Sequence, residues 1–207
     1  MADSIWPTIH AERRALADDL SDLTDDDWAT QSLCSEWDVH EVLAHQVSAA
    51  KMTPARFFAA FSSARFGFDR FAARQVALES AAGPAHTLAE FRNVQNRTTA
   101  PPGPKATWLG EAFVHGEDIR RPLGIHRDYP LPQVCRSIAF YASSNAVIGG
   151  RTRVAGLTLT ATDADFSIGA GPLVEGPAIS LLLAASGRPC ALDERTGPGV
   201  DVLRHRA

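Results

Sequence analysis

A change of periodicity near Gly150 is the feature that most constrains the fold. Before it, apolar residues recur three and four positions apart in segments 5–22, 66–80 and 87–97, which is the spacing of amphipathic helices. After it, the stretch VAGLTLTAT alternates and is rich in β-branched residues, which predicts a strand. Two short strand-like pieces, ADFSIGAG and PLVEG, and an apolar helical segment, PAISLLLAASG, follow. We therefore predict an α-helical bundle over residues 1–150 and a small α+β domain over residues 151–207.

Local signals suggest where individual helices begin and end. Ser35, with Asp38 three residues later, resembles a capping box and predicts the start of the helix in CSEWDVHEVLAHQVSAAKM. Thr87 is expected to cap the helix over 87–97. The stretch TTAPPGPK breaks the helical pattern, and a further helix is expected to stop at the two glycines 149 and 150.

Composition and charge argue against several classes of protein. The 207 residues are 45% hydrophobic, which is enough for a core, and the formal net charge of −4 gives no electrostatic case for binding nucleic acid. No apolar run reaches the roughly 18 residues of a membrane span. The first residues, MADSIWPTIHAERR, lack the pattern of a signal peptide, so we expect a cytoplasmic protein that does not bind membranes.

The three cysteines do not suggest a disulfide framework or a cysteine zinc site. Cys34, Cys135 and Cys190 are odd in number and form no C-x-x-C pair. We expect each to be a small buried apolar residue and not a nucleophile.

The segment WLGEAFVHGEDIRRPLG carries the clearest chemical signal. Glu111 and His115 are four residues apart on an expected helix, so their side chains share one face and can address a single point. Leu109, Ala112 and Phe113 flank the pair, which places it towards the interior. Alone, this spacing is more often a hydrogen-bonded or solvated pair than a metal site.

A third ligand would have to come from another helix of the bundle. The helix that follows Trp37 offers His40 and His45. At about 100° per residue, His45 falls at the edge of the apolar face, whereas His40 falls opposite it and is expected to meet solvent. From the residues alone, a core histidine that donates to a carbonyl is the favoured interpretation of His45.

Two motifs together resemble a known family. The stretch CSEWDVHEVLAHQ contains Trp37 and EVLAH ending at His45, and WLGEAFVHGEDIRRPLG contains an E-x-x-x-H-x-x-D pattern at Glu111, His115 and Asp118. They are similar to the motifs of the actinobacterial maleylpyruvate isomerase family of mycothiol-dependent enzymes, and the resemblance covers nearly the whole chain. It implies a DinB-like bundle of four main helices, with His45, Glu111 and His115 as metal ligands.

The resemblance also implies chemistry. An ion held by two histidines and one glutamate keeps an open position, zinc being preferred and nickel, cobalt or iron acceptable. Mycothiol, a low-molecular-weight thiol, would bind there and attack a small electrophilic substrate, giving isomerisation or S-transfer. Two alternatives stay open: a non-catalytic protein that binds a metal or small molecule, and a metal-dependent hydrolase.

Further residues have candidate roles near such a site. Asp118 could orient a ligand histidine, or could instead pair with Arg121 or Arg92. The resemblance implies a catalytic arginine in the C-terminal domain, for which Arg188 is the best match, although Arg188 could equally pair with nearby Asp193 or Glu194. The phenylalanine-rich segment FFAAFSSARFGFDRF could line an apolar substrate pocket, but most of its aromatic rings are expected to pack in the core.

Overall fold

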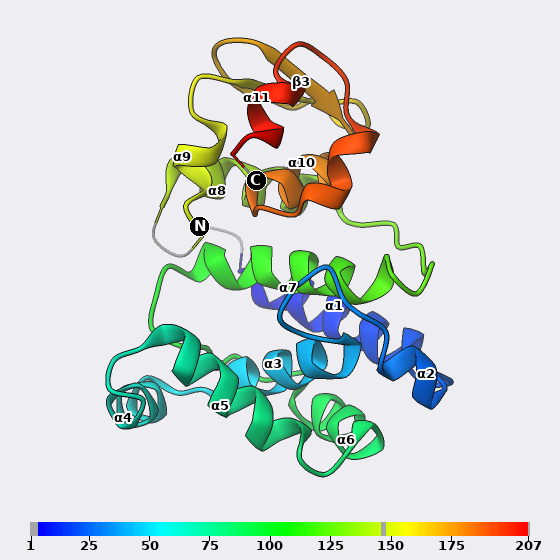
Figure 1. The fold of residues 1–207 in the computed structure, drawn as a ribbon, viewed down its shortest axis with the longest axis vertical. Coiled ribbons are helices and arrows are strands. Elements are labelled where there is room, and N and C mark those ends of the chain that lie inside the picture. Colours follow the sequence, from blue (N-terminus) through cyan, green and yellow to red (C-terminus); the bar gives the residue numbers. More distant parts are fainter. Residues whose placement is uncertain (1–3, 146–147, 207) are drawn as a thin grey trace. The chain divides into compact units, whose positions relative to one another are not determined.

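The computed structural model describes residues 4–145 and 148–206 and divides into two compact units. The first unit comprises residues up to 104 together with 115–126, and the second comprises 105–114 together with residues from 127 onwards. One helix, α7, contributes to both units (Figure 1). This division lies elsewhere than at residue 150, and the domain ranges 1–150 and 151–207 stay a prediction. Among the described residues, no helix is long and apolar enough to cross a membrane.

The helices up to residue 120 are mostly long and amphipathic. They are α1 (Trp6–Asp19), α2 (Asp25–Trp28), α3 (Val39–Lys51), α4 (Pro54–Ser63), α5 (Phe68–Ser80), α6 (Pro84–Val94) and α7 (Lys105–Arg120). Helix α3 packs against both α5 and α6, and α6 also packs against α1.

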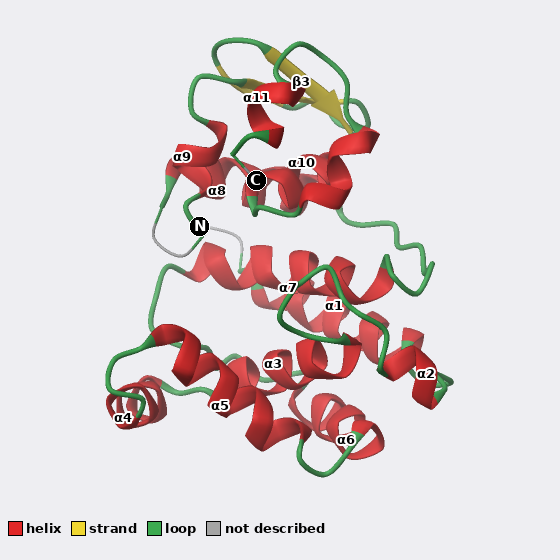
Figure 2. Ribbon diagram, viewed as in Figure 1, coloured by secondary structure: helices red, strands yellow, loops and turns green. Residues whose placement is uncertain are grey.

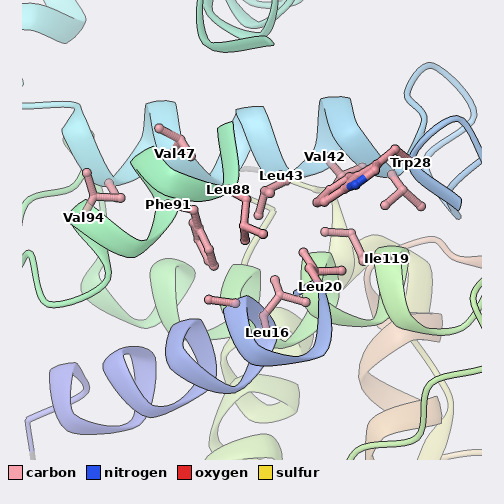
Figure 3. Packing of buried hydrophobic residues seen from close by; sticks show 13 residues of the cluster. Leu16, Leu20, Trp28, Val42, Leu43, Val47, Leu88, Phe91, Val94 and Ile119 are labelled. Carbon is pink, nitrogen blue, oxygen red and sulfur yellow. The ribbon is translucent and has the colours of Figure 1, made fainter. Parts of the chain in front are cut away.

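Four long helices supply most of the core of the first unit, as expected for the bundle. Figure 3 shows Leu16 of α1, Leu20 at the C-cap of α1, Leu43 of α3, Phe91 of α6 and Ile119 of α7 packed together. All five side chains are almost completely buried. Each contributes about 1.5–3 kcal/mol relative to an exposed side chain.

Helix α3 begins three residues later than predicted. Its N-cap is Asp38 and not Ser35, because Asp38 forms a reciprocal capping box with Glu41. Ser35 is exposed and lies in a loop whose backbone is held by hydrogen bonds from Gln31 and Ser32. The prediction for Thr87 was also wrong: α6 starts at Pro84, and Thr87 is buried inside it with its hydroxyl donating to the carbonyl of Glu79.

The second unit contains the small α+β arrangement that the sequence predicted. Its elements are α8 (Leu131–Ser143), α9 (Gly150–Val154), β1 (Thr158–Ala161), β2 (Ser167–Gly169), β3 (Leu173–Gly176), α10 (Ala178–Ala185), the 3-10 helix η1 (Pro189–Glu194) and α11 (Val200–Arg204). The sheet order is β2-β1-β3, with β1 antiparallel to β2 and parallel to β3 (Figure 2). The buried helix α10 packs against both α8 and the sheet. Helix α8 ends at Ser143, earlier than the glycines expected to stop it; Gly150 instead begins α9.

The phenylalanine-rich segment is less buried than expected. Phe57 and Phe61 of α4 are half-buried and pack on buried Phe71 of α5. Other rings are solvent-exposed: Phe58 at 62%, Phe66 at 71% and Phe68 at 58%. The expectation of core packing was therefore wrong for these three rings. Phe58 lies on an exposed side of α4, Phe66 lies in the turn that follows it, and Phe68 is the first residue of α5.

Candidate metal centre

His45 lies on the partly buried edge of α3, between two aromatic rings. Its imidazole is tilted against the indole of Trp37, with ring centroids 4.8 Å apart. On its other side the ring of His115 meets it edge to face at 4.9 Å. The capping box at Asp38 fixes the start of α3 and therefore the direction in which His45 projects.

Helix α7 carries the other two predicted ligands. Glu111 and His115 are one turn apart on this continuous helix, so the backbone holds their side chains on the same face. One ligand atom from each of His45, Glu111 and His115 lies within 4.8 Å of the other two. The structure thus brings one potential ligand atom of each residue towards a common point.

Asp118 is fully buried and contacts His115 directly. One of its carboxylate oxygens, Oδ2, lies 2.9 Å from Nδ1 of His115. The two arginines that the sequence offered as partners have other contacts: Arg121 pairs with Glu117 at 2.6 Å, and Arg92 donates to Ser21 at 2.8 Å. A histidine whose Nδ1–H donates to a carboxylate commonly binds a metal through Nε2.

The protonation of His115 reflects this contact. Burial lowers its pKa, but hydrogen bonds and negative charge from Asp118, with a further contribution from Cys34, outweigh burial and raise the pKa to about 10. A metal ion must displace a proton from the nitrogen to which it binds, so metal binding here would release a proton.

Cys34 is a neighbour of the site that sequence reasoning missed. Its thiol donates to the same Oδ2 atom of Asp118 at 3.2 Å. Cys34 packs against the core as a small apolar residue, as expected, but it is only partly buried, and the loop before α3 also brings its thiol to α7. Cys135 is half-buried, and burial raises the pKa of its thiol, which disfavours the nucleophilic thiolate. The side chain of Cys190 lies outside the described part of the chain.

His40 is not the solvent-facing histidine that its position on the helix suggested. It is partly buried, its Nε2 lies 2.8 Å from the hydroxyl of Thr87, and its ring meets Trp28 edge to face. Burial lowers the pKa of His40, outweighing the opposite effect of Asp38 and Glu41. The contact with Thr87 of α6, which is distant in the sequence, covers His40 and explains the difference.

Arg188 belongs to the second unit and follows α10. Its backbone N–H donates to Leu183 at 2.9 Å, and its guanidinium donates to the carbonyl of Ser186 at 3.1 Å. Arg153 braces the same turn by donating to the carbonyl of Ala185 at 2.8 Å. These hydrogen bonds hold the turn that carries Arg188 in place. The catalytic role of Arg188 stays a prediction.

The donor set fits a catalytic ion better than a structural one. Two imidazoles and one carboxylate supply three ligands, whereas structural zinc sites use four, commonly with several cysteines. The hydrogen bond from His115 to a buried carboxylate is the usual companion of a metal-binding histidine.

Comparisons with known proteins concern the family and the fold. Residues 9–103 match the family described as the mycothiol maleylpyruvate isomerase N-terminal domain. No curated protein matches the chain by sequence. Two crystal structures of the mycothiol-dependent maleylpyruvate isomerase share the fold, and each alignment covers 94% of this chain and 91% of the other. A histidine-to-alanine mutant of that enzyme aligns with a TM-score of 0.61 at 16% identity, and the other structure with 0.55 at 13%. Residues 9–103 are therefore similar to the mycothiol maleylpyruvate isomerase N-terminal domain, and the chain shares its fold with the two crystal structures.

Proposed function

We propose that this protein is a metal-dependent enzyme that uses mycothiol for isomerisation or S-transfer on a small electrophilic substrate. The observation that carries the proposal is the convergence of His45, Glu111 and His115, whose ligand atoms lie within 4.8 Å of one another. The family match and the shared fold supply the identity of the thiol. Such an enzyme would work in the cytoplasm, where low-molecular-weight thiols are kept reduced.

The residues of the site have separate tasks in this proposal. His45, Glu111 and His115 would hold the ion. This donor set suits zinc, and nickel, cobalt and iron(II) accept the same donors. Asp118 holds Nδ1 of His115 and so directs Nε2 towards the ion. When bound, the ion favours the thiolate form of a coordinated thiol, which is the nucleophile.

Substrate recognition is assigned to Arg188. Small electrophiles of the maleylpyruvate kind carry carboxylates, and a guanidinium can bind a carboxylate through two parallel hydrogen bonds. Lysine provides only a point charge. We expect Arg188→Lys to keep the metal content and the fold and to lose at least about tenfold in turnover, as when one preorganised charge contact is removed. Turnover within twofold of wild type would remove Arg188 from the mechanism.

The decisive experiment combines metal analysis with thiol binding. Purified protein should contain about one divalent ion per chain, and calorimetric titration should detect mycothiol binding only to the metal-loaded form. The double variant His45→Ala, His115→Ala should lose both the ion and thiol binding while keeping its helical content. His86→Ala, which changes an exposed histidine of α6 in the same unit, is the matched control and should keep both.

Other results would redirect the assignment. An ion without thiol binding, together with ester or amide hydrolysis, would favour a metal-dependent hydrolase. An ion without turnover of any electrophile would favour a non-catalytic binding protein. Unchanged metal content in the double variant would reject the three ligands.

A further inference from the structure

We propose that Cys34, Asp118 and Nδ1 of His115 form a second ion site, selective for thiophilic divalent cations such as zinc and cadmium. One ligand atom from each of these residues lies within 4.8 Å of the other two. All three belong to the first compact unit. The site is distinct from the first because neither Cys34 nor Asp118 is a ligand there.

The distances are close to those that a bound ion needs. Zinc–sulfur bonds are about 2.3 Å and zinc bonds to nitrogen or oxygen about 2.0–2.1 Å. A tetrahedral ion therefore holds sulfur and oxygen ligands about 3.5 Å apart, and nitrogen and oxygen ligands about 3.3 Å apart. The corresponding distances are 3.2 Å from Cys34 Sγ to Asp118 Oδ2 and 2.9 Å from His115 Nδ1 to the same oxygen. Each pair needs to separate by only about 0.3–0.4 Å.

The chemistry of the three donors selects the kind of ion. A thiolate prefers soft or borderline cations, and an imidazole beside it suits zinc and cadmium but not calcium or magnesium. Asp118 is fully buried and supplies a negative charge at a point where a cation would offset the cost of burying it. Cys34 and His115 are both partly exposed to solvent.

The loop that carries Cys34 is held in place independently of any ion. The backbone N–H of Cys34 donates to Ser32, and its carbonyl accepts from both Gln31 and Trp37. The N–H of Leu33 donates to the backbone carbonyl of Asp118 at 3.1 Å, which ties the loop directly to α7. Little conformational entropy is lost on binding, because the donors are already near their final positions.

His115 is shared, so the two sites are coupled. An ion at the second site replaces the proton on Nδ1, while Nε2 continues to face the first site.

A cadmium titration separates the two sites, because only a thiolate ligand gives the ultraviolet sulfur-to-cadmium charge-transfer band. The reference protein carries Cys135→Ser and Cys190→Ser, which leaves Cys34 as its only thiol. We expect it to bind two cadmium ions, one of which produces the band. Adding Cys34→Ser should remove the band and reduce the stoichiometry to one, with unchanged circular dichroism as evidence of folding.

Two further variants make the result specific. In the reference protein, Asp118→Asn should weaken the ion that gives the band by at least about tenfold, since it removes a charged ligand. His45→Ala should abolish binding of the cadmium ion that gives no band, and the band itself should remain. The second site would then be observed without the first. Two ions in His45→Ala would reject the first site and leave the second intact. Absence of the band in the reference protein, or its persistence after Cys34→Ser, would overturn the second site.

Discussion

Asp118→Asn tests how much of the affinity of the first site comes from a residue that does not bind the ion. The substitution keeps the size of the side chain and removes its negative charge. Asp118 is fully buried, and its Oδ2 accepts from Nδ1 of His115 at 2.9 Å. In the variant, a neutral amide oxygen can still accept that hydrogen bond, so the ring can keep its orientation while losing the charged partner.

The expected loss follows from the nature of this contact. Hydrogen bonds to charged groups contribute about 1.5–3 kcal/mol, roughly twice a neutral one. Replacing the charged acceptor by a neutral one therefore costs on the order of 1–2 kcal/mol. Changes to the partners of metal-bound histidines typically lower metal affinity about 10–100-fold, or about 1.4–2.7 kcal/mol. We expect a loss of about tenfold, measured at a pH high enough that no proton competes with the ion for His115.

The loss should grow with pH. In the wild type, Asp118 and Cys34 raise the pKa of His115 to about 10, so below that pH a proton competes with the ion. The substitution lowers this pKa, so in the variant a proton stops competing with the ion for His115 at a lower pH. Wild-type affinity should therefore keep rising towards pH 10 after that of the variant has levelled off.

The assay is competition for zinc with a chromophoric chelator, at no more than one equivalent of zinc so that the tighter site is measured. Glu117→Gln is the matched control: it removes the same charge from the adjacent residue of α7, whose carboxylate pairs with Arg121. Equal zinc affinity in wild type and Asp118→Asn would refute the argument. An equal loss in Glu117→Gln would attribute the effect to net charge and not to the contact with His115.

Three further predictions concern the stability of the fold, each measured by urea unfolding. Asp38→Ala removes the capping-box acceptor of α3 and should cost about 1 kcal/mol. Gly171→Ala should lower the free energy of unfolding by at least about 2 kcal/mol, because φ is positive there and the added Cβ would meet the backbone carbonyl of Gly156. Gly156 also has a positive φ but open space around it, so Gly156→Ala should cost only about 1 kcal/mol. Burial lowers the pKa of His40, so the unfolded chain binds a proton at this residue more readily than the folded chain does. The free energy of unfolding should therefore be unaffected by His40 above about pH 6.5 and should decline as the pH falls below it. This part of the pH dependence should disappear in His40→Gln.

The helices could be predicted from the sequence because the spacing of their apolar residues is a local property. The residues at which they begin and end could not always be predicted. Ser35 with Asp38 and Asp38 with Glu41 are both acceptable capping boxes in the sequence. The second is used because Gln31 and Ser32 already hold the backbone of the preceding loop in a non-helical conformation. The prediction that His40 meets solvent was wrong for a related reason. A helical wheel identifies one apolar face, whereas α3 packs against more than one neighbour.

The residues of the site differ in the same way: some could be related to each other from one helix of the sequence, whereas others meet only through the tertiary structure. Glu111 and His115 could be paired from the sequence because one helical turn fixes their relation. Asp118 could be named as a neighbour of His115 for the same reason, although only the structure chooses it over an arginine pair. Cys34 lies 84 positions from Asp118, and nothing in its local sequence marks it as polar or reactive. Its contact depends on a loop conformation fixed by backbone hydrogen bonds and on the docking of that loop against α7. A thiol that looked inert in the sequence thus becomes, through tertiary structure alone, a neighbour of two candidate metal-site residues.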